Sequence, residues 1–118
     1  MQAVAEELTY RQVCNLDDLW AGEMQTYTVD GTEILLVHTE CGEVRAIQAV
    51  CPHQRVPLVD GMLQGSVLTC SAHLWQVDVI TGKGVNPHHA EVAHYPSKVE
   101  GGNVFVAVGG VKPKFSRP

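Results

Sequence analysis

Two short motifs, each holding one cysteine and one histidine, constrain this chain more than any other feature. The first is Cys51-Pro52-His53 and the second is Cys70-Ser71-Ala72-His73, with sixteen residues between them. Thiolates and imidazoles are the usual protein ligands of zinc and of iron–sulfur centres. A structural zinc site commonly takes two cysteines from one turn and two histidines from a later segment, whereas each motif here supplies one of each. The pattern therefore indicates a metal centre held by two mixed loops, and a structural zinc module stays as the alternative of a different class.

The segments around these motifs have the pattern of antiparallel strands. Short runs of alternating or β-branched residues are separated by Gly, Asp-Gly and Pro, which predicts an all-β fold with little helix. We expect strands over residues 24–29, 33–38, 43–50, 66–70, 75–80, 97–100 and 103–108. Asp30-Gly31 and Gly101-Gly102 favour tight hairpin turns. A short helical turn is expected at residues 15–20, capped by Asn15, and the basic tail 111–118 is expected to fray.

Length and charge limit the class of protein. A chain of 118 residues is long enough for one domain with its own core, and we expect a single domain over residues 1–118. Thirteen acidic against eight basic residues give a net charge of -5, which argues against a nucleic-acid partner. No apolar run approaches the roughly 18 residues that span a bilayer, and the N-terminal residues are acidic rather than signal-like, so we expect a cytoplasmic protein. A disulfide between the remaining cysteines, Cys14 and Cys41, is not expected in that compartment.

The two motifs and their separation resemble the signature of Rieske proteins. The resemblance implies one [2Fe-2S] cluster in which Cys51 and Cys70 hold one iron and His53 and His73 hold the other. It also implies the Rieske fold, in which antiparallel sheets form a sandwich base and two ligand loops form a cluster-binding lobe, here about residues 47–87. With two thiolates and two neutral imidazoles the oxidised cluster is neutral, so it accepts an electron more readily than a four-cysteine cluster.

The chain lacks several groups found in the respiratory and photosynthetic Rieske subunits. Val56 and Ala72 stand where those proteins have a second cysteine pair that forms a disulfide between the loops. Trp75 and Val77 stand where a serine and a tyrosine donate hydrogen bonds to the cluster and a ligand sulfur. Because fewer donors stabilise the reduced form less, we expect a reduction potential toward the low end of the range of roughly -150 to +300 mV, and below about +150 mV.

The resemblance extends to a narrower family over nearly the whole chain. Residues 14–24, 51–54, 73–75 and 81–87 are similar to the Rieske ferredoxins of four-component diiron monooxygenases, the toluene 4-monooxygenase ferredoxin family. This implies a monomeric electron carrier with no catalytic site of its own. It would dock transiently with an NADH-dependent flavin and iron–sulfur reductase and with a diiron hydroxylase that oxidises aromatic hydrocarbons or alkenes. A ferredoxin of a ring-hydroxylating dioxygenase and a Rieske component of a nitrite-reductase-type system remain alternatives.

A few residues outside the four ligands are candidates for shielding or docking. Gly82, Gly84 and Pro87 match a third loop that covers the cluster in Rieske proteins. Trp75 is a candidate docking residue, although strand alternation favours its burial in the core equally. His88 and His89 directly follow Pro87, and we hypothesise that they lie near the cluster.

Overall fold

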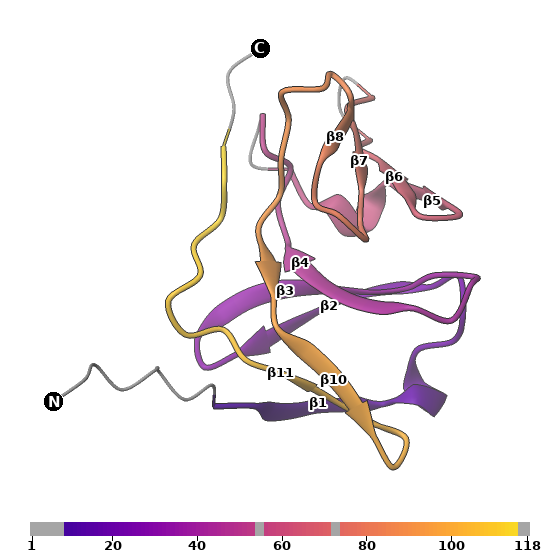
Figure 1. The fold of residues 1–118 in the computed structure, drawn as a ribbon, viewed down its shortest axis with the longest axis vertical. Helices are drawn as coiled ribbons and strands as arrows, with labels where there is room; N and C mark the ends of the chain where they lie inside the picture. Colours follow the sequence, from indigo (N-terminus) through magenta and orange to yellow (C-terminus); the bar gives the residue numbers. More distant parts are fainter. Residues whose placement is uncertain (1–8, 54–55, 72–73, 116–118) are drawn as a thin grey trace, which may run out of the picture.

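Three antiparallel sheets form the part of the chain that the computed structural model describes, residues 9–53, 56–71 and 74–115 (Figure 1). The first sheet has the order β1 (Arg11–Asn15), β11 (Asn103–Val106), β10 (Ser97–Glu100). The second has the order β2 (Met24–Val29), β3 (Thr32–His38), β4 (Val44–Gln48), β9 (His94–Tyr95). The third has the order β5 (Met62–Gln64), β6 (Val67–Thr69), β7 (Gln76–Asp78), β8 (Gly84–Asn86). The all-β prediction is confirmed.

Helix is limited, in the described ranges, to single turns of 3-10 helix. They are η1 (Leu16–Asp18) and η2 (Leu58–Asp60). The predicted cap of the first turn is present, because Asn15 Oδ1 accepts a hydrogen bond from the Asp17 N–H at 3.0 Å. Neither turn approaches the length of a membrane-spanning helix, and no described helix could cross a bilayer.

The second sheet is the middle layer of the molecule, between the first and third sheets (Figure 1). Four consecutive β3 residues, Ile34 to Val37, are fully buried. Leu35 and Val37 pack in a core shared with the third sheet, whereas Ile34 and Leu36 pack in a core shared with the first sheet. Successive side chains of a strand point to opposite faces, so an unbroken apolar run suits a strand that is covered on both sides.

Both predicted hairpin turns are confirmed. β2 and β3 pair as far as Val29 opposite Thr32, around Asp30 and Gly31, whose φ angles are 48° and 81°. β10 and β11 pair as far as Glu100 opposite Asn103, around Gly101 and Gly102 at 59° and 81°. Two positive φ angles in a row are the geometry of a type I′ turn, and its twist matches that of antiparallel strands.

Two features of the fold differ from the sequence predictions. Strands β1, β5, β8 and β9 were not expected, since these segments of two to five residues lack a clear alternation. The prediction that the tail frays is wrong for residues 111–115, because the buried Gln48 side chain bonds both the N–H and the carbonyl of Lys114. Val111 also packs against the core between the first and second sheets. Residues 116–118 lie outside the described ranges.

Candidate metal centre

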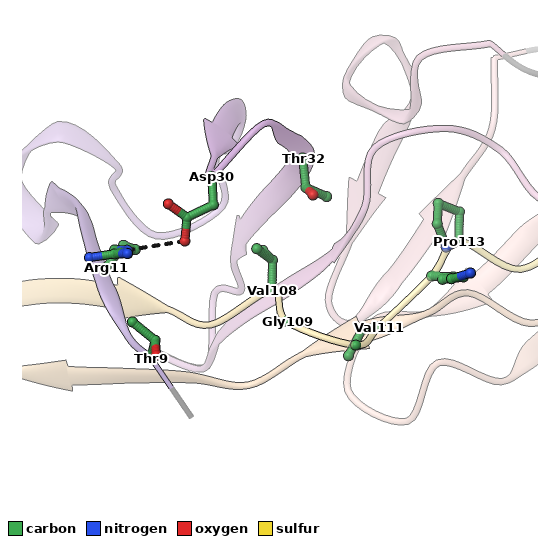
Figure 2. A pocket seen from close by; sticks show the side chains of 10 residues that line it. Thr9, Arg11, Asp30, Thr32, Val108, Gly109, Val111 and Pro113 are labelled. Carbon is green, nitrogen blue, oxygen red and sulfur yellow. Dashed lines mark hydrogen bonds and ion pairs between the residues drawn. The ribbon is translucent and has the colours of Figure 1, made fainter. Parts of the chain in front are cut away.

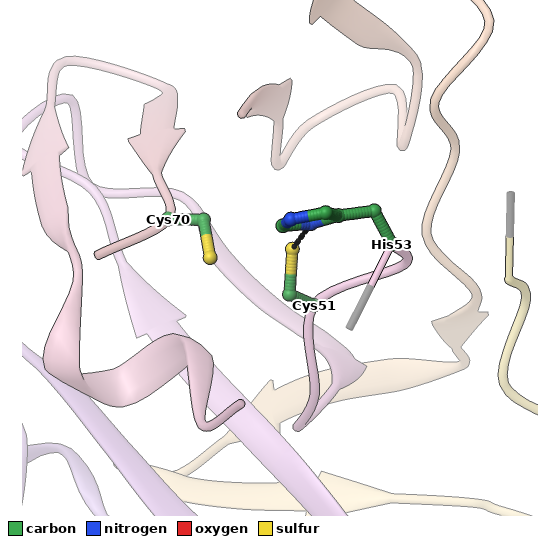
Figure 3. A group of neighbouring side chains, drawn as sticks. All are labelled: Cys51, His53 and Cys70. Atoms are coloured by element: carbon green, nitrogen blue, oxygen red, sulfur yellow. Dashed lines mark hydrogen bonds between the residues drawn. The ribbon is translucent and has the colours of Figure 1, made fainter. Parts of the chain in front are cut away.

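Three of the four predicted ligands come together at one point of the fold (Figure 3). One ligand atom from each of Cys51, His53 and Cys70 lies within 4.8 Å of the others. The Cys51 Sγ is 3.0 Å from the His53 Nδ1. Both cysteines are buried and His53 is half-buried, so the group lies just below the surface. His73, the fourth predicted ligand, and Ala72 lie outside the described residues.

The first ligand loop leaves the second sheet after β4 and is closed by backbone hydrogen bonds. The Cys51 N–H donates to the Val56 carbonyl at 2.9 Å, and the Leu58 N–H donates to the Ala49 carbonyl at 2.9 Å. Pro52, which has no N–H to satisfy, is buried within the loop. These bonds place Cys51 at the closed base of the loop, with His53 two residues further out.

The second ligand loop connects β6 to β7 in the third sheet. Thr69 pairs with Gln76, and the Cys70 N–H donates to the Trp75 carbonyl at 2.7 Å, which closes the turn. Leu74 has a φ of 57°, the left-handed conformation that lets the chain reverse over a few residues. Cys70 therefore stands at the end of a paired strand, where its position is set by the sheet.

The Trp75 ring lies against the first ligand loop. It stacks on His53 with ring centroids 4.4 Å apart and an interplanar angle of 16°. His89 meets the indole edge-on, at 5.4 Å and 80°. Trp75 is half-buried and also packs against the core beside the third sheet. The burial that strand alternation favours is therefore partial, and the rest of the ring lies beside a predicted ligand. The hypothesis that His89 lies near this site agrees with the contact, and His88 is exposed.

The third loop has glycines where the backbone leaves no room for a side chain. A Cβ on Gly84 would lie 2.3 Å from the Pro87 carbonyl oxygen, and one on Gly82 would lie 2.9 Å from the Val92 carbonyl oxygen. Gly82 has in addition a φ of 78°. The two glycines thus allow the tight turn that carries residues 87–89 toward Trp75.

The residues present fit a [2Fe-2S] cluster of the mixed type. Two buried sulfurs and one half-buried imidazole converge from two loops, so the described residues already supply both kinds of ligand, as required where one iron is bound by thiolates and the other by imidazoles. Apolar side chains, Leu58, Leu68 and Val77, form the surrounding core. Such a shell keeps water away and raises the influence of nearby charges on the redox group.

A pocket lies away from this site, between β1, the β2–β3 turn and the tail (Figure 2). It has a volume of about 800 Å³, and its lining includes the ion pair of Arg11 Nε with Asp30 Oδ2 at 3.0 Å. Thr9, Thr32 and residues 108–113 complete its lining. None of its lining residues belongs to the ligand loops.

Comparisons with known proteins agree with this geometry. The Rieske [2Fe-2S] domain model matches residues 9–96. The chain is 45% identical, over 88% of its length and 85% of that protein, to the ferredoxin component of an alkene monooxygenase system from Xanthobacter autotrophicus. It is 35% identical, over 77% of its length and 88% of that protein, to the ferredoxin component of naphthalene 1,2-dioxygenase/salicylate 5-hydroxylase systems from a Ralstonia species.

A solved structure shows the same fold. The ferredoxin of carbazole 1,9a-dioxygenase from Nocardioides aromaticivorans superposes with a TM-score of 0.76 at 31% identity, covering 84% of this chain and 97% of that one. The chain therefore belongs to the Rieske [2Fe-2S] domain family, and its cofactor is a Rieske-type [2Fe-2S] cluster.

Proposed function

We propose that the chain is the electron-carrier ferredoxin of an oxygenase system and that Cys51, His53, Cys70 and His73 bind its cluster. The observation that carries the proposal is the convergence of Cys51, His53 and Cys70 within 4.8 Å. His73 completes the set by its spacing from Cys70. When bound, the cluster stores and releases one electron at a time. The chain is not itself an oxygenase. We further propose that residues 47–87 are the cluster-binding lobe of one domain over residues 1–118.

The proposed partners are an NADH-dependent flavin and iron–sulfur reductase and a diiron monooxygenase hydroxylase acting on aromatic hydrocarbons or alkenes. The similarity to a ferredoxin component of an alkene monooxygenase system, at 45% identity, supports the monooxygenase assignment. A dioxygenase system is the second candidate, supported by 35% identity to the naphthalene dioxygenase component. We also propose that the chain works in the reducing cytoplasm, where Cys14 and Cys41 would stay as free thiols.

The face around the ligand loops has the features of a transient docking surface. Leu74 is 67% exposed and Val85 is 38% exposed, so two large apolar side chains lie open next to the second and third loops. Trp75 of the second loop and His89 form an aromatic pair, and Pro87 lies in the third loop two residues before His89. We propose that a monomer docks through this face, because a carrier must bring its redox group close to each partner and then release it.

Metal analysis and single-turnover kinetics test the proposal. Protein purified without oxygen is expected to contain two irons and two acid-labile sulfides per chain, and Cys51→Ser is expected to lose them. Cys41→Ser is the matched control, because Cys41 is an exposed cysteine outside both motifs. Zinc at one per chain, with no iron or sulfide, would show a structural zinc module instead.

The choice of partner is tested with the same material. The reduced ferredoxin is mixed with a diiron alkene or toluene hydroxylase, with a Rieske-type aromatic dioxygenase, and with a nitrite-reductase-type flavoprotein. We expect rapid electron transfer to the diiron hydroxylase. Faster transfer to the dioxygenase would favour the second candidate.

A further inference from the structure

Gln48, the last residue of β4, is a fully buried polar side chain that joins three separate segments of the chain. Its Oε1 accepts hydrogen bonds from the backbone N–H groups of Ala93 and Lys114, both at 2.8 Å. Its Nε2 donates to the carbonyls of Val50 and Lys114, both at 2.9 Å. The two oxygen lone pairs and the two N–H groups of the amide are therefore all used.

One of these bonds reaches the first ligand loop. Val50 immediately precedes Cys51, and the Gln48 amide nitrogen that bonds its carbonyl also bonds the carbonyl of Lys114. The Gln48 side chain thus connects the backbone of the tail to the loop that carries Cys51 and His53. Because a planar amide has fixed directions for its four bonds, the two Lys114 bonds restrict how the amide can turn toward Val50.

A second contact holds the tail in the same place. The Lys114 Nζ lies 3.4 Å from Glu91 Oε2, and the Lys83 Nζ lies 3.2 Å from that oxygen. The hydrogen bond from Lys83, followed by the hydrogen bond from Lys114, lowers the pKa of Glu91. The Rieske domain model matches residues 9–96, so Lys114 lies beyond the matched residues.

We propose that Gln48 is a positioning residue that couples the tail, residues 111–115, to the Cys51 loop, so that a segment more than fifty residues away in the sequence helps hold the cluster ligands. The inference rests on the proposed function only in that those ligands bind a redox cluster. If the Lys114 bonds are lost, the amide keeps one N–H and part of its oxygen capacity unsatisfied in a buried site. The amide can then rotate to form other hydrogen bonds and lose its bond to the Val50 carbonyl, so the backbone before Cys51 is held less firmly.

Two substitutions of Lys114 distinguish the effect of its backbone hydrogen bond from the effect of its side chain. Lys114→Pro removes the N–H that bonds Gln48, whereas Lys114→Ala keeps both backbone bonds and removes only the ion pair with Glu91. Hydrogen–deuterium exchange is measured on holoprotein for residues 49–58 and for β2 and β3. In Lys114→Pro we expect exchange in residues 49–58 to be about tenfold faster, the effect of losing one buried hydrogen bond. In Lys114→Ala we expect it to stay within about twofold of the unchanged protein.

The reduction potential is the second readout, since a tail that only adds stability would leave it unchanged. Lys114→Pro is expected to shift the potential and the EPR g values of the reduced protein, and Lys114→Ala is not. Equal behaviour of the two variants in both measurements would overturn the proposal. Equal acceleration of exchange in β2 and β3 would also overturn it, because the effect would then be global unfolding. Absence of iron from the unchanged protein would instead refute the proposed function, and the exchange measurement would still test the coupling.

Discussion

Gly61 lies between the end of the first ligand loop and the start of the second, and replacing it by alanine should separate them. It follows η2, which ends the first ligand loop, and its Cα lies against the carbonyl of Thr69, the residue before Cys70. A Cβ on Gly61 would lie 2.2 Å from the Thr69 carbonyl oxygen, 3.2 Å from the Thr69 carbonyl carbon and 3.2 Å from the Leu58 carbonyl oxygen. All three are backbone atoms and cannot rotate away.

The size of the effect follows from these distances. An ordinary contact needs more than 3.4 Å, so either η2 or the end of β6 must move by more than an ångström. Overpacking of this kind costs about 1–3 kcal/mol. For a chain of this length that corresponds to a melting temperature lower by about 4–12 °C. The movement also changes the separation of the Cys51 and Cys70 sulfurs, so we expect the cluster to be lost more readily.

Gly109→Ala is the matched control for Gly61→Ala. A Cβ on Gly109 meets no atom of the described chain within 4 Å, and the residue has no positive φ. Its alanine variant should be neutral or more stable by about 0.4–1 kcal/mol. Thermal melting and iron content are measured on both variants. Equal melting temperatures and equal iron content would refute the reasoning that Gly61 sets the spacing of the two loops.

Three further predictions follow from single contacts. The Tyr95 hydroxyl is buried without a hydrogen-bond partner among the described residues, so Tyr95→Phe should raise the free energy of unfolding by about 1 kcal/mol, and a lower melting temperature would contradict this. Burial, followed by the hydrogen bond with Cys14, raises the pKa of Tyr27 to about 12, from about 10 when unfolded. Because the folded state holds this proton more tightly, stability should fall as the pH rises from about 10 to about 12, and urea midpoints for Tyr27→Phe should fall less over that interval. Trp75→Ala removes the ring stacked on His53, an interaction worth about 0.5–1.5 kcal/mol, so a chelator should bleach the cluster about two- to tenfold faster, while Trp75→Phe should lie between. Identical bleaching rates would show that the stack does not protect the site.

The ligand motifs and the hairpins could be predicted from the sequence because their signals are local. Cys51 and His53 are two residues apart and Cys70 and His73 three, so each loop carries its own signature. Asp30-Gly31 requires two positive φ angles wherever it joins two strands. The all-β prediction rests on the same local patterns of turns and alternation.

The position of Trp75 shows where a local pattern gives only part of the contacts. Alternation along residues 75–80 places Trp75 on the face of Val77 and Val79, and its ring does pack against the core that contains them, although β7 begins only at Gln76. Trp75 also belongs to the turn that Cys70 closes, and its ring stacks on the first ligand loop, which the two-residue period of a strand does not predict. Its contacts with His53 and His89 depend on how three loops meet.

The tail and Gln48 depend on contacts between residues distant in the sequence. Two lysines and a proline in residues 111–115 favour fraying, yet the bonds that hold this segment are made by its backbone and by a side chain 66 residues away. A backbone bond is independent of which side chains the tail carries. A lone glutamine in an apolar strand likewise gives no sign of its partners, since Ala93 lies 45 residues away.

Pulsed EPR of the reduced protein, labelled with ¹⁵N-histidine, tests most directly whether two mixed loops hold the cluster. We expect two strongly coupled histidine nitrogens, one of which is lost in any variant of His53 or His73 that retains iron. His38→Ala should lose neither, because His38 is bonded instead to the Leu19 carbonyl. A spectrum without histidine coupling, or one unchanged by substitution of both His53 and His73, would show that these loops do not hold the cluster.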